Sequence, residues 1–406
     1  MNAVFFNEYI QTSPRFMTDF TPWTLFVDTG IISVLLLLGK LMRVKIRFIQ
    51  RLFIPPSLLA GFIGLSLGPH GFGIIPLSTQ TGTYAGILIA FIFGALPLIS
   101  QKAAKGDADN IGSMWAYSQA GMLLQWAFGG LLGLLVLNRI WPLNPAFGIT
   151  MPSGYCGGHG TAIGQAFSQF GYDEILTLAM TAATFGIVAA VIIGLIIIKW
   201  GTKKGHTSFL ANYDDLPHEL QTGLLPGDKR ESMGESSCSS ISIDPLTFNL
   251  IIVAVIALGG YCISKTVSHF MPGFELPVFS CAFVVGIFIK KIFDKTRTSD
   301  YVCPQTIGHI SGAFTDFLVA FGIASIKISV VIEYIIPLLI LLVSGLIATL
   351  IYVLVMARKL MKECWFEKAI FTWGWFTGTM AMGIALLRVA DPKMRSRCLD
   401  NYALAY

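Results

Sequence analysis

The sequence predicts an all-α polytopic membrane protein made of two inverted five-helix repeats, each with one re-entrant, broken segment. Three observations predict this fold. Of the 406 residues, 54% are hydrophobic and 13% are charged, whereas a soluble domain carries roughly 25% charged residues. Several apolar stretches contain almost no charge over roughly 20 residues, which is the length that crosses the hydrocarbon core of a bilayer. A glycine-rich stretch then interrupts the apolar pattern once in each half of the chain.

The first repeat is predicted over residues 21–198, after an extracytoplasmic N-terminal segment over 1–20. Its predicted spans are apolar stretches separated by basic or turn-forming residues, at 21–39, 52–67, 83–99, 112–137 and 175–198. The second span is short and opens with Pro55-Pro56, and proline in the first helical turn fixes where a helix starts. Asp28 lies near one end of the first span, and we expect it at the membrane interface.

Residues 199–244 form a long polar segment that is rich in serine and contains the run Ser236-Ser237-Cys238-Ser239-Ser240. Such a composition cannot bury an apolar face and is typical of a flexible linker. We therefore predict a linker between the two repeats.

The second repeat is predicted over residues 245–406. Its spans lie at 245–264, 276–289, 307–326 and 330–356, and a Gly/Thr-rich stretch follows at 371–390. A fifth span would begin near Tyr406, where the sequence stops, so we expect the last helix to be truncated. The short second spans of the two repeats correspond at a constant offset of 222 residues, which pairs Ile54, Pro55, Ala60 and Gly64 with Leu276, Pro277, Ala282 and Gly286.

Basic residues decide the predicted orientation. With the N-terminus outside, all but four of the 28 lysines and arginines face the cytoplasm, and the exceptions are Arg15, Arg139, Lys265 and Lys327. Cytoplasmic loops of membrane proteins are enriched in these residues, so we expect residues 199–244 to be cytoplasmic. Because each repeat has an odd number of spans, the second inserts upside down. Paired broken segments in inverted repeats are typical of secondary transporters.

The first glycine-rich stretch reads Ser153-Gly154-Tyr155-Cys156-Gly157-Gly158-His159-Gly160-Thr161-Ala162. Glycine leaves backbone N–H and C=O groups open, and such a stretch lies at membrane depth only where protein covers it or where it lines a wet cavity. The second stretch is similar, because Gly160-Thr161-x-x-Gly164-x-Ala166 corresponds to Gly378-Thr379-x-x-x-Gly383-x-Ala385 with one residue inserted. Close glycine packing between helices is the alternative explanation for both stretches.

The residues Gly157-Gly158-His159-Gly160-Thr161 resemble the Ser-Gly-Gly-His-Gly-Thr signature in the first re-entrant segment of the bacterial sodium/glutamate symporters. Ala183-Thr184-Phe185-Gly186 is similar to the family's Ala-Thr-Phe-Gly in the fifth helix, and the order of spans, broken segments and linker is similar over nearly the whole chain. The second half departs from the pattern. Where the glutamate carriers have a Gly-rich, Ala-Thr-Pro-Thr type stretch, this chain has Thr377-Gly378-Thr379-Met380-Ala381-Met382, which leaves the substrate open.

The resemblance implies a multi-pass transporter of the bacterial inner (plasma) membrane, with both termini outside. It also implies a homodimer in which a mobile transport part carries both re-entrant segments past a fixed scaffold. The implied function is symport of L-glutamate, or a similar anionic amino acid, with co-transported sodium ions by alternating access.

Several alternatives stay open at this point. Another carboxylate, or coupling to protons, would keep the same class of transporter. From other classes, a channel could use the re-entrant loops as a pore, and an intramembrane hydrolase would need Cys156 and His159 as nucleophile and base. We expect a transporter rather than an enzyme, with no nucleic-acid partner.

The candidate site combines open backbone, hydroxyl groups and a few ionisable side chains. Sodium needs hard oxygen ligands, which unwound carbonyls and hydroxyls supply, and a carboxylate prefers N–H groups at a half-helix N-terminus or a guanidinium. The residues that we predict to contact the substrate are Ser153, Gly157, Gly158, His159, Gly160, Thr161, Thr377, Gly378, Thr379 and Arg388. The residues that we predict to contact sodium are Asp316, Thr161 and Thr379.

Three ionisable residues have alternative roles. His159 could orient the substrate, carry a proton or hydrogen-bond its own loop. Arg388 could pair with a substrate carboxylate, with Asp391 as its resting partner, or anchor the cytoplasmic end of its helix. Asp316 lies inside an apolar span, where a carboxylate is costly and usually functional, and its alternative is a structural pair.

Overall fold

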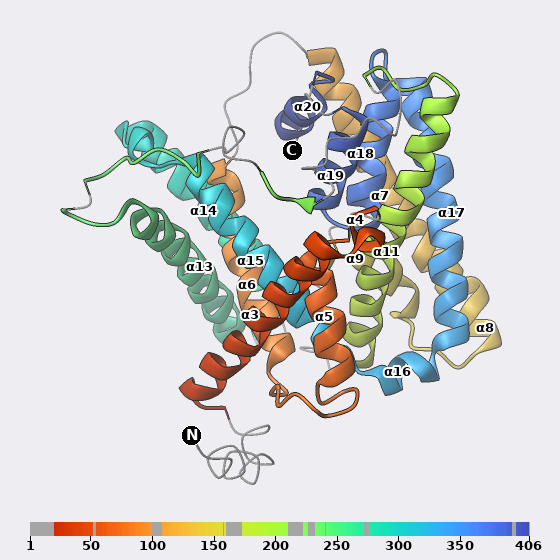
Figure 1. The fold of residues 1–406 in the computed structure, drawn as a ribbon, viewed down its shortest axis with the longest axis horizontal. Coiled ribbons are helices and arrows are strands. Elements are labelled where there is room, and N and C mark those ends of the chain that lie inside the picture. Colours follow the sequence, from red (N-terminus) through yellow and green to blue (C-terminus); the bar gives the residue numbers. More distant parts are fainter. Residues whose placement is uncertain are drawn as a thin grey trace.

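The computed structural model describes residues 20–51, 54–99, 108–156, 158–159, 173–209, 222–225, 232–239, 241–271, 276–391 and 395–405. Every regular element within these residues is a helix (Figure 1). Seven of the described helices are long and apolar enough to cross a membrane. The chain is therefore an all-α, multi-pass membrane protein, as predicted.

The first half of the chain contributes helices of very different lengths. They are α3 (Pro22–Lys45), α4 (Arg47–Arg51), α5 (Pro56–Leu67), α6 (Thr81–Ile99), α7 (Ala108–Leu132), α8 (Asn138–Ile140), α9 (Thr150–Tyr155) and α11 (Asp173–Lys203). A π-helical turn, Gly133–Leu137, joins α7 to α8, and a 3-10 turn, Phe147–Ile149, leads into α9.

The second half follows the linker region. Its helices are α13 (Pro245–Phe270), α14 (Val278–Thr296), α15 (Pro304–Ala324), α16 (Ile328–Glu333), α17 (Ile335–Leu360), α18 (Trp365–Thr377), α19 (Met380–Ala390) and α20 (Cys398–Ala405). The short α20 lies where the fifth span of this half is predicted to begin.

Prolines set the starts of the two helices that were predicted to correspond. Pro55 caps α5 and Pro277 caps α14, each with extended backbone angles just before the first helical residue. Proline is pre-organised for the start of a helix because its fixed φ suits the helix and its missing N–H would have no partner there. α5 is only 12 residues long, so it covers little more than half of a bilayer core.

The span predicted near residues 330–356 is present as α17, but it begins only at Ile335, and the residues before it form the separate short helix α16. The helix breaks at Tyr334, whose hydroxyl donates to Glu174 Oε2 at 3.0 Å. Pro337 explains the break: inside a helix its ring would clash with the carbonyl four residues earlier, at Glu333, and it offers no N–H to that carbonyl.

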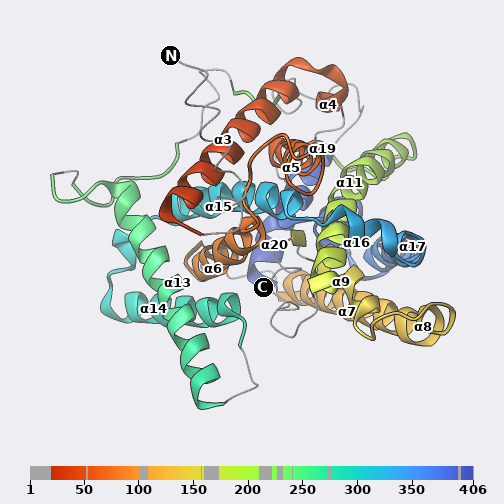
Figure 2. The same cartoon turned by 90° about the horizontal axis from the view of Figure 1, so that it is seen from below.

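The long helices gather into two bundles, and each bundle takes helices from both halves of the chain (Figures 1 and 2). The first bundle contains α3, α5, α6, α13, α14 and α15, in which α15 packs on both α5 and α6. The second bundle contains α7, α9, α11, α17, α18, α19 and α20. Within the second bundle, α11 contacts α9, α18, α19 and α17.

α11 is the central helix of the second bundle. Within its most apolar stretch 67% of the residues are buried, against 22% for α3, which identifies α3 as a peripheral helix and α11 as a core one. Small residues make this burial possible. A Cβ at Gly186 would lie 2.0 Å from the Thr377 carbonyl oxygen, and a Cβ at Gly194 would lie 2.6 Å from a Leu386 methyl. Neighbouring segments therefore approach the backbone of α11 directly.

A buried carboxylate ties α3 to α6 in the first bundle. Asp28 is 0% exposed, so protein encloses its carboxylate, and its place at the membrane interface stays a prediction. Its carboxylate accepts hydrogen bonds from the Ser78 N–H at 3.0 Å, the Ser78 hydroxyl and the Tyr84 hydroxyl at 2.9 Å. Three donors satisfy the charge in a place where an unpaired one would be costly.

We predict that Asp28→Ala destabilises the protein by at least about 2 kcal/mol, because three buried donors lose their acceptor. The measurement is the thermal midpoint of the detergent-solubilised protein. Asp109→Ala is the matched control: Asp109 is 88% exposed and meets Lys362 at 3.5 Å, and such surface pairs contribute little. Equal midpoints for the two variants would contradict a structural role for Asp28.

Candidate binding site where two broken segments meet

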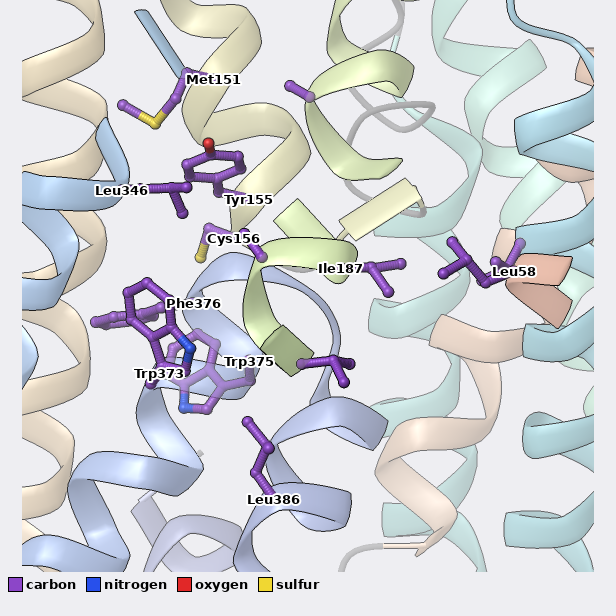
Figure 3. Packing of buried hydrophobic residues seen from close by; sticks show 14 of the residues in the cluster. Leu58, Met151, Tyr155, Cys156, Ile187, Leu346, Trp373, Trp375, Phe376 and Leu386 are labelled. Carbon is purple, nitrogen blue, oxygen red and sulfur yellow. The ribbon is translucent and has the colours of Figure 1, made fainter. Parts of the chain in front are cut away.

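The first broken segment leaves its helix after one and a half turns. α9 has six residues, all buried, and Cys156 departs from helical geometry with ψ of 95°. Tyr155 anchors the segment by donating from its hydroxyl to the Leu342 carbonyl of α17 at 2.9 Å. In Figure 3, Tyr155 and Cys156 lie above Phe376 and Trp373 of α18. Gly154 lets α9 approach α11, since a Cβ there would lie 2.4 Å from the Ala183 nitrogen.

The second broken segment is a hairpin of two short helices. α18 ends at Thr377 and α19 begins at Met380, with Gly378 at φ −140° and ψ −105° between them. The helices have 13 and 11 residues, so each is roughly 16–20 Å long and too short to cross a bilayer core. They pack closely where glycines face, because a Cβ at Gly374 would lie 2.6 Å from Gly383 Cα.

The tips of the two broken segments touch at Gly158. This residue has φ of +68°, a left-handed conformation that favours glycine. A Cβ at this position would lie 2.7 Å from both the Gly378 carbonyl oxygen and Thr379 Cγ2. Two independent reasons therefore require glycine at Gly158, and the predicted meeting of the two glycine-rich stretches occurs here.

α19 begins at this contact, with its N-terminus beside Gly158. Thr379 caps the helix by accepting a hydrogen bond from the Met382 N–H at 3.4 Å, and its side chain is half-buried. The first N–H groups of a helix have no partner within the helix and carry the positive end of its dipole. The meeting point therefore presents hydrogen-bond donors suited to an anion.

His159 contributes an acceptor to the same place. The residue is 0% exposed, and its Nε2 lies 2.9 Å from the Thr184 hydroxyl, which itself donates to the Met180 carbonyl at 3.0 Å. Since that hydroxyl has one proton, Nε2 must donate to it. Nδ1 has no hydrogen-bond partner among the described residues, and a proton there would leave an unpaired buried charge. Nδ1 therefore carries a lone pair that can accept a hydrogen bond from a donor.

His159 also lies at the junction of the two bundles. A Cβ on Gly322 of α15 would lie 3.4 Å from His159 Cδ2 and 2.6 Å from Met180 Cε. Gly322 belongs to the first bundle, whereas Thr184 and Met180 belong to α11 in the second. The candidate site thus lies where the bundles meet.

Two predicted hydroxyl groups are already engaged by their own helices. Ser153 and Thr377 are both 0% exposed. Ser153 donates to the Ile149 carbonyl and Thr377 donates to the Trp373 carbonyl, each at 2.7 Å. These bonds leave only oxygen lone pairs free, so either residue can offer an acceptor but not a donor.

Other predicted site residues lie elsewhere. Arg388 is exposed in the last turn of α19, nine residues after Thr379. Asp391 accepts from the Ser396 N–H at 2.7 Å, and the described residues show no ion pair between it and Arg388. Asp316 lies on α15, six residues before Gly322. Gly157, Gly160 and Thr161 lie outside the described residues.

Cys156 does not form the pair that a hydrolase would need. Both Cys156 and His159 are buried, but His159 Nε2 bonds to Thr184 and Nδ1 has no partner in the described part of the chain. No thiol–imidazole contact is therefore present between them.

Gln125 is a residue of this region that the sequence analysis missed. Its amide nitrogen donates to the Phe376 carbonyl and to the Thr349 hydroxyl, both at 2.9 Å. It holds the last turn of α18 against α7 and α17. Its buried Oε1 has no partner among the described residues. The available signal was a lone amide inside an apolar span, where polar groups are costly.

The described residues thus bring together open backbone, a helix N-terminus and a buried imidazole, and the comparison with known families is decisive at this point. The sodium/glutamate symporter family matches residues 111–385. The chain belongs to this family. The match covers α7 to most of α19 and so contains both broken segments. The predicted resemblance is confirmed, and the family is one of transporters rather than enzymes.

Individual symporters of the family are distant relatives. The sodium/glutamate symporters of Escherichia coli (strain K12) and Shigella flexneri are each 24% identical to this chain over 277 residues, which cover 64% of this chain and 61% of theirs. The chain therefore spans about 61% of the length of these relatives. Among solved structures, the sodium proton antiporter MjNhaP1 from Methanocaldococcus jannaschii matches with a TM-score of 0.47 and 15% identity, covering 94% of this chain and 93% of that one.

We predict that Gly158→Ala destabilises this symporter-family protein. The positive φ alone costs a residue with a side chain about 1–2 kcal/mol, and the contact at 2.7 Å with Gly378 adds to it. The thermal midpoint in detergent measures the effect. Gly130→Ala is the control, because a Cβ there meets nothing within 4 Å. A Gly158→Ala midpoint at or above that of the control would contradict the tip contact.

Proposed function

We propose that this protein is a secondary transporter that carries L-glutamate, or a similar anionic amino acid, together with sodium ions. Substrate and sodium bind where the two broken segments touch, and access alternates between the two sides of the membrane. The observation that carries the proposal is the meeting of the α19 N-terminus, Gly158 and His159 at the junction of two bundles, in a chain of the sodium/glutamate symporter family.

The substrate's carboxylate binds at the N-terminus of α19. The free N–H groups and the dipole of this half-helix favour negative charge. The Thr379 hydroxyl, which accepts from Met382, keeps its proton for a further hydrogen bond. Among the described residues, the meeting point holds no arginine or lysine, so the backbone supplies the attraction for the anion.

The substrate's ammonium binds at His159. An ammonium has three donors and no acceptor, and Nδ1 of His159 is a buried acceptor that has no partner among the described residues. Desolvated hydrogen bonds with one charged partner are stronger than neutral ones. His159 therefore binds the amino group of the substrate, and this hydrogen bond distinguishes an amino acid from a dicarboxylate without an amino group.

Sodium binds on oxygen atoms of the same unwound backbone. The Gly378 carbonyl lies at the tip contact with Gly158, and the next residue, Thr379, supplies the hydroxyl that caps α19. Carbonyls freed by a helix break and hydroxyls are the hard ligands that the ion prefers. Thr161, which lies outside the described residues, stays a prediction as a sodium ligand. Asp316, the other predicted ligand, lies on α15 six residues before Gly322, away from this contact.

Alternating access rests on the proposed inverted repeat. Contacts between helices recur in exchanged form: α5 packs on α15 as α14 packs on α6, and α3 packs on α5 as α13 packs on α14. α6 also packs on α15, and α7 on α17, which pairs the third and fourth spans of the two halves. This pattern supports a pseudo-twofold relation in the membrane plane. We propose that the second bundle moves against the first, within a homodimer whose N-termini lie outside.

Reconstitution tests the function directly. In liposomes containing the purified protein, we expect labelled L-glutamate to accumulate under an inward sodium gradient and not under potassium at equal ionic strength. Folded protein that accumulates no glutamate with either a sodium or a proton gradient would contradict the proposal. Accumulation under a proton gradient alone would show that protons, and not sodium ions, are the coupling ion. If other carboxylates compete with labelled L-glutamate for uptake, the protein carries another substrate.

A sharper prediction concerns His159. His159→Gln should weaken L-glutamate binding by about tenfold or more, because a hydrogen bond to a charged group contributes about 1.5–3 kcal/mol. Binding of glutarate, which lacks the amino group, should change much less. Calorimetric titration in detergent measures both affinities. His269→Gln, at the exposed end of α13, is the control. Equal losses of affinity for L-glutamate and glutarate would show that His159 does not bind the ammonium group.

A further inference from the structure

One face of α15 is polar and open over its first half. The exposed positions recur every three or four residues, at Gln305, His309, Gly312, Ala313 and Asp316. A cavity of about 490 Å³ lies on this face, lined by Gly308, His309, Gly312, Ala313, Thr315 and Asp316. The opposite face of the same helix, at Ile307 and Phe314, packs on α6 and α13.

The shortness of α5 explains why the cavity is present. α5 packs along the second half of α15, from Ser57 beside the Asp316 carboxylate to Gly64 facing Ala324. Because α5 begins at Pro56, the turns of α15 before Asp316 have no cover from it. Glycines enlarge the space, since a Cβ at Gly308 or Gly312 would meet nothing within 4 Å.

Asp316 indicates that the cavity is wet. The residue is exposed within a helix apolar enough to span the membrane. Its carboxylate contacts the Ser57 hydroxyl, and the described residues show it in no ion pair. A carboxylate facing lipid is costly, whereas one facing water or a passing cation is not. The polar side chains of Gln305 and His309 are exposed on the same face, and they too are costly in lipid unless water solvates them.

The cavity lies along α15 between the contact of this helix with the linker and its contact with the candidate site. At its outer end, the first turn of α15 contacts the linker: Thr306 donates to the Met233 carbonyl, and Cys303 Sγ accepts from the Glu235 N–H, both at 3.4 Å. The lining ends at Asp316, and residues 318–324 beyond it are buried. Gly308, Thr315 and Gly322 are spaced by seven residues, so one face of α15 runs from the cavity to Gly322. Gly322 is the residue that meets His159. Figure 2 shows α15 in the interior, between α3 and α6.

We propose that this cavity is the cytoplasmic vestibule through which sodium reaches and leaves the candidate site, and that Asp316 draws the cation in. The inference rests on the proposed function for the identity of the cation. A single carboxylate on an otherwise apolar membrane helix attracts cations and repels anions. Asp316 lies about 9 Å along the helix axis from Gly322, so it acts on the ion before the site does.

Cysteine labelling tests the vestibule without any need for transport. In a background in which the native cysteines are replaced, Gly312→Cys and Ala313→Cys should react with small water-soluble methanethiosulfonates added on the linker side. Ser239→Cys in the linker marks that side and gives the reference rates for a cationic and an anionic reagent. Ile347→Cys on α17, where the native side chain is 55% exposed on an apolar face, should not react.

The charge of Asp316 gives a second readout. Relative to Ser239→Cys, the cationic reagent should be favoured at Gly312→Cys by several-fold, and Asp316→Asn should remove that preference. Absence of labelling at both positions, or a preference that Asp316→Asn leaves unchanged, would overturn the vestibule. A labelling pattern as expected in a protein that carries no glutamate would leave the vestibule in place and remove only the proposed cargo.

Sidedness separates a vestibule residue from a ligand of the central site. Asp316→Asn should lower the apparent sodium affinity several-fold when sodium is varied on the linker side, with little change when it is varied on the other side. An equal loss from both sides would assign Asp316 to the bound-ion site and overturn its role in the vestibule.

Discussion

The structure depends on direct backbone contact between segments that are not helical at their tips. Gly158 meets Gly378 and Thr379, and Gly186 meets the Thr377 carbonyl, at distances that admit no side chain. At bilayer depth an unwound backbone is stable only if protein or water, and not lipid, surrounds it. Because these glycines have no side chains, the backbone of each broken segment covers the backbone of the other. This mutual cover stabilises the helix breaks in both segments.

α11 makes this arrangement one body. It contacts α9 through Gly154, the end of α18 through Gly186, and α19 through Gly194, while Trp373 Nε1 donates to its Ala190 carbonyl at 3.1 Å. Both broken segments are therefore fixed to the same helix, and in the proposed alternating access they move together with it. The contact with the first bundle at this level is smaller, with Gly322 against His159 and Met180. A junction formed at a glycine has few interlocking side chains, which is compatible with the proposed movement of one bundle against the other.

Features set by local chemistry could be predicted from the sequence, and features set by helix rotation could not. The short α5 follows from Pro55, and the break after Thr377 follows from Gly378, because proline and glycine act on their own backbone. The break at Tyr334 was predictable in the same way from Pro337. By contrast, a rotation of 100° per residue decides whether a side chain faces a site, its own helix or lipid. Arg388 is exposed at the far end of α19, and the Ser153 and Thr377 hydroxyls bond to their own helices.

The same limit applies to buried polar residues. Asp28 and Gln125 each stand out in the sequence as polar groups in apolar spans, but their partners are distant in the chain. Asp28 needs Ser78 and Tyr84, and Gln125 needs Thr349 and Phe376. The sequence identifies such residues as costly without showing what satisfies them. Only the packing of α3 on the loop before α6, and of α7 on α17 and α18, reveals that they are structural clamps.

The charge balance of the candidate site gives coupling a physical basis. Among the described residues, the meeting point of the broken segments offers a helix dipole, N–H groups, hydroxyls and a neutral imidazole, but no arginine or lysine. A helix dipole contributes only about half an elementary charge at its end, which does not balance a net negative amino acid in a site shielded from water. Moving that anion alone into a low-dielectric junction is strongly unfavourable. In the proposed function, a sodium ion on the neighbouring carbonyl and hydroxyl oxygens supplies the missing charge, so the binding of sodium and the binding of the amino acid favour each other. In this arrangement, coupling is a consequence of electrostatics at the site and needs no separate device elsewhere in the fold.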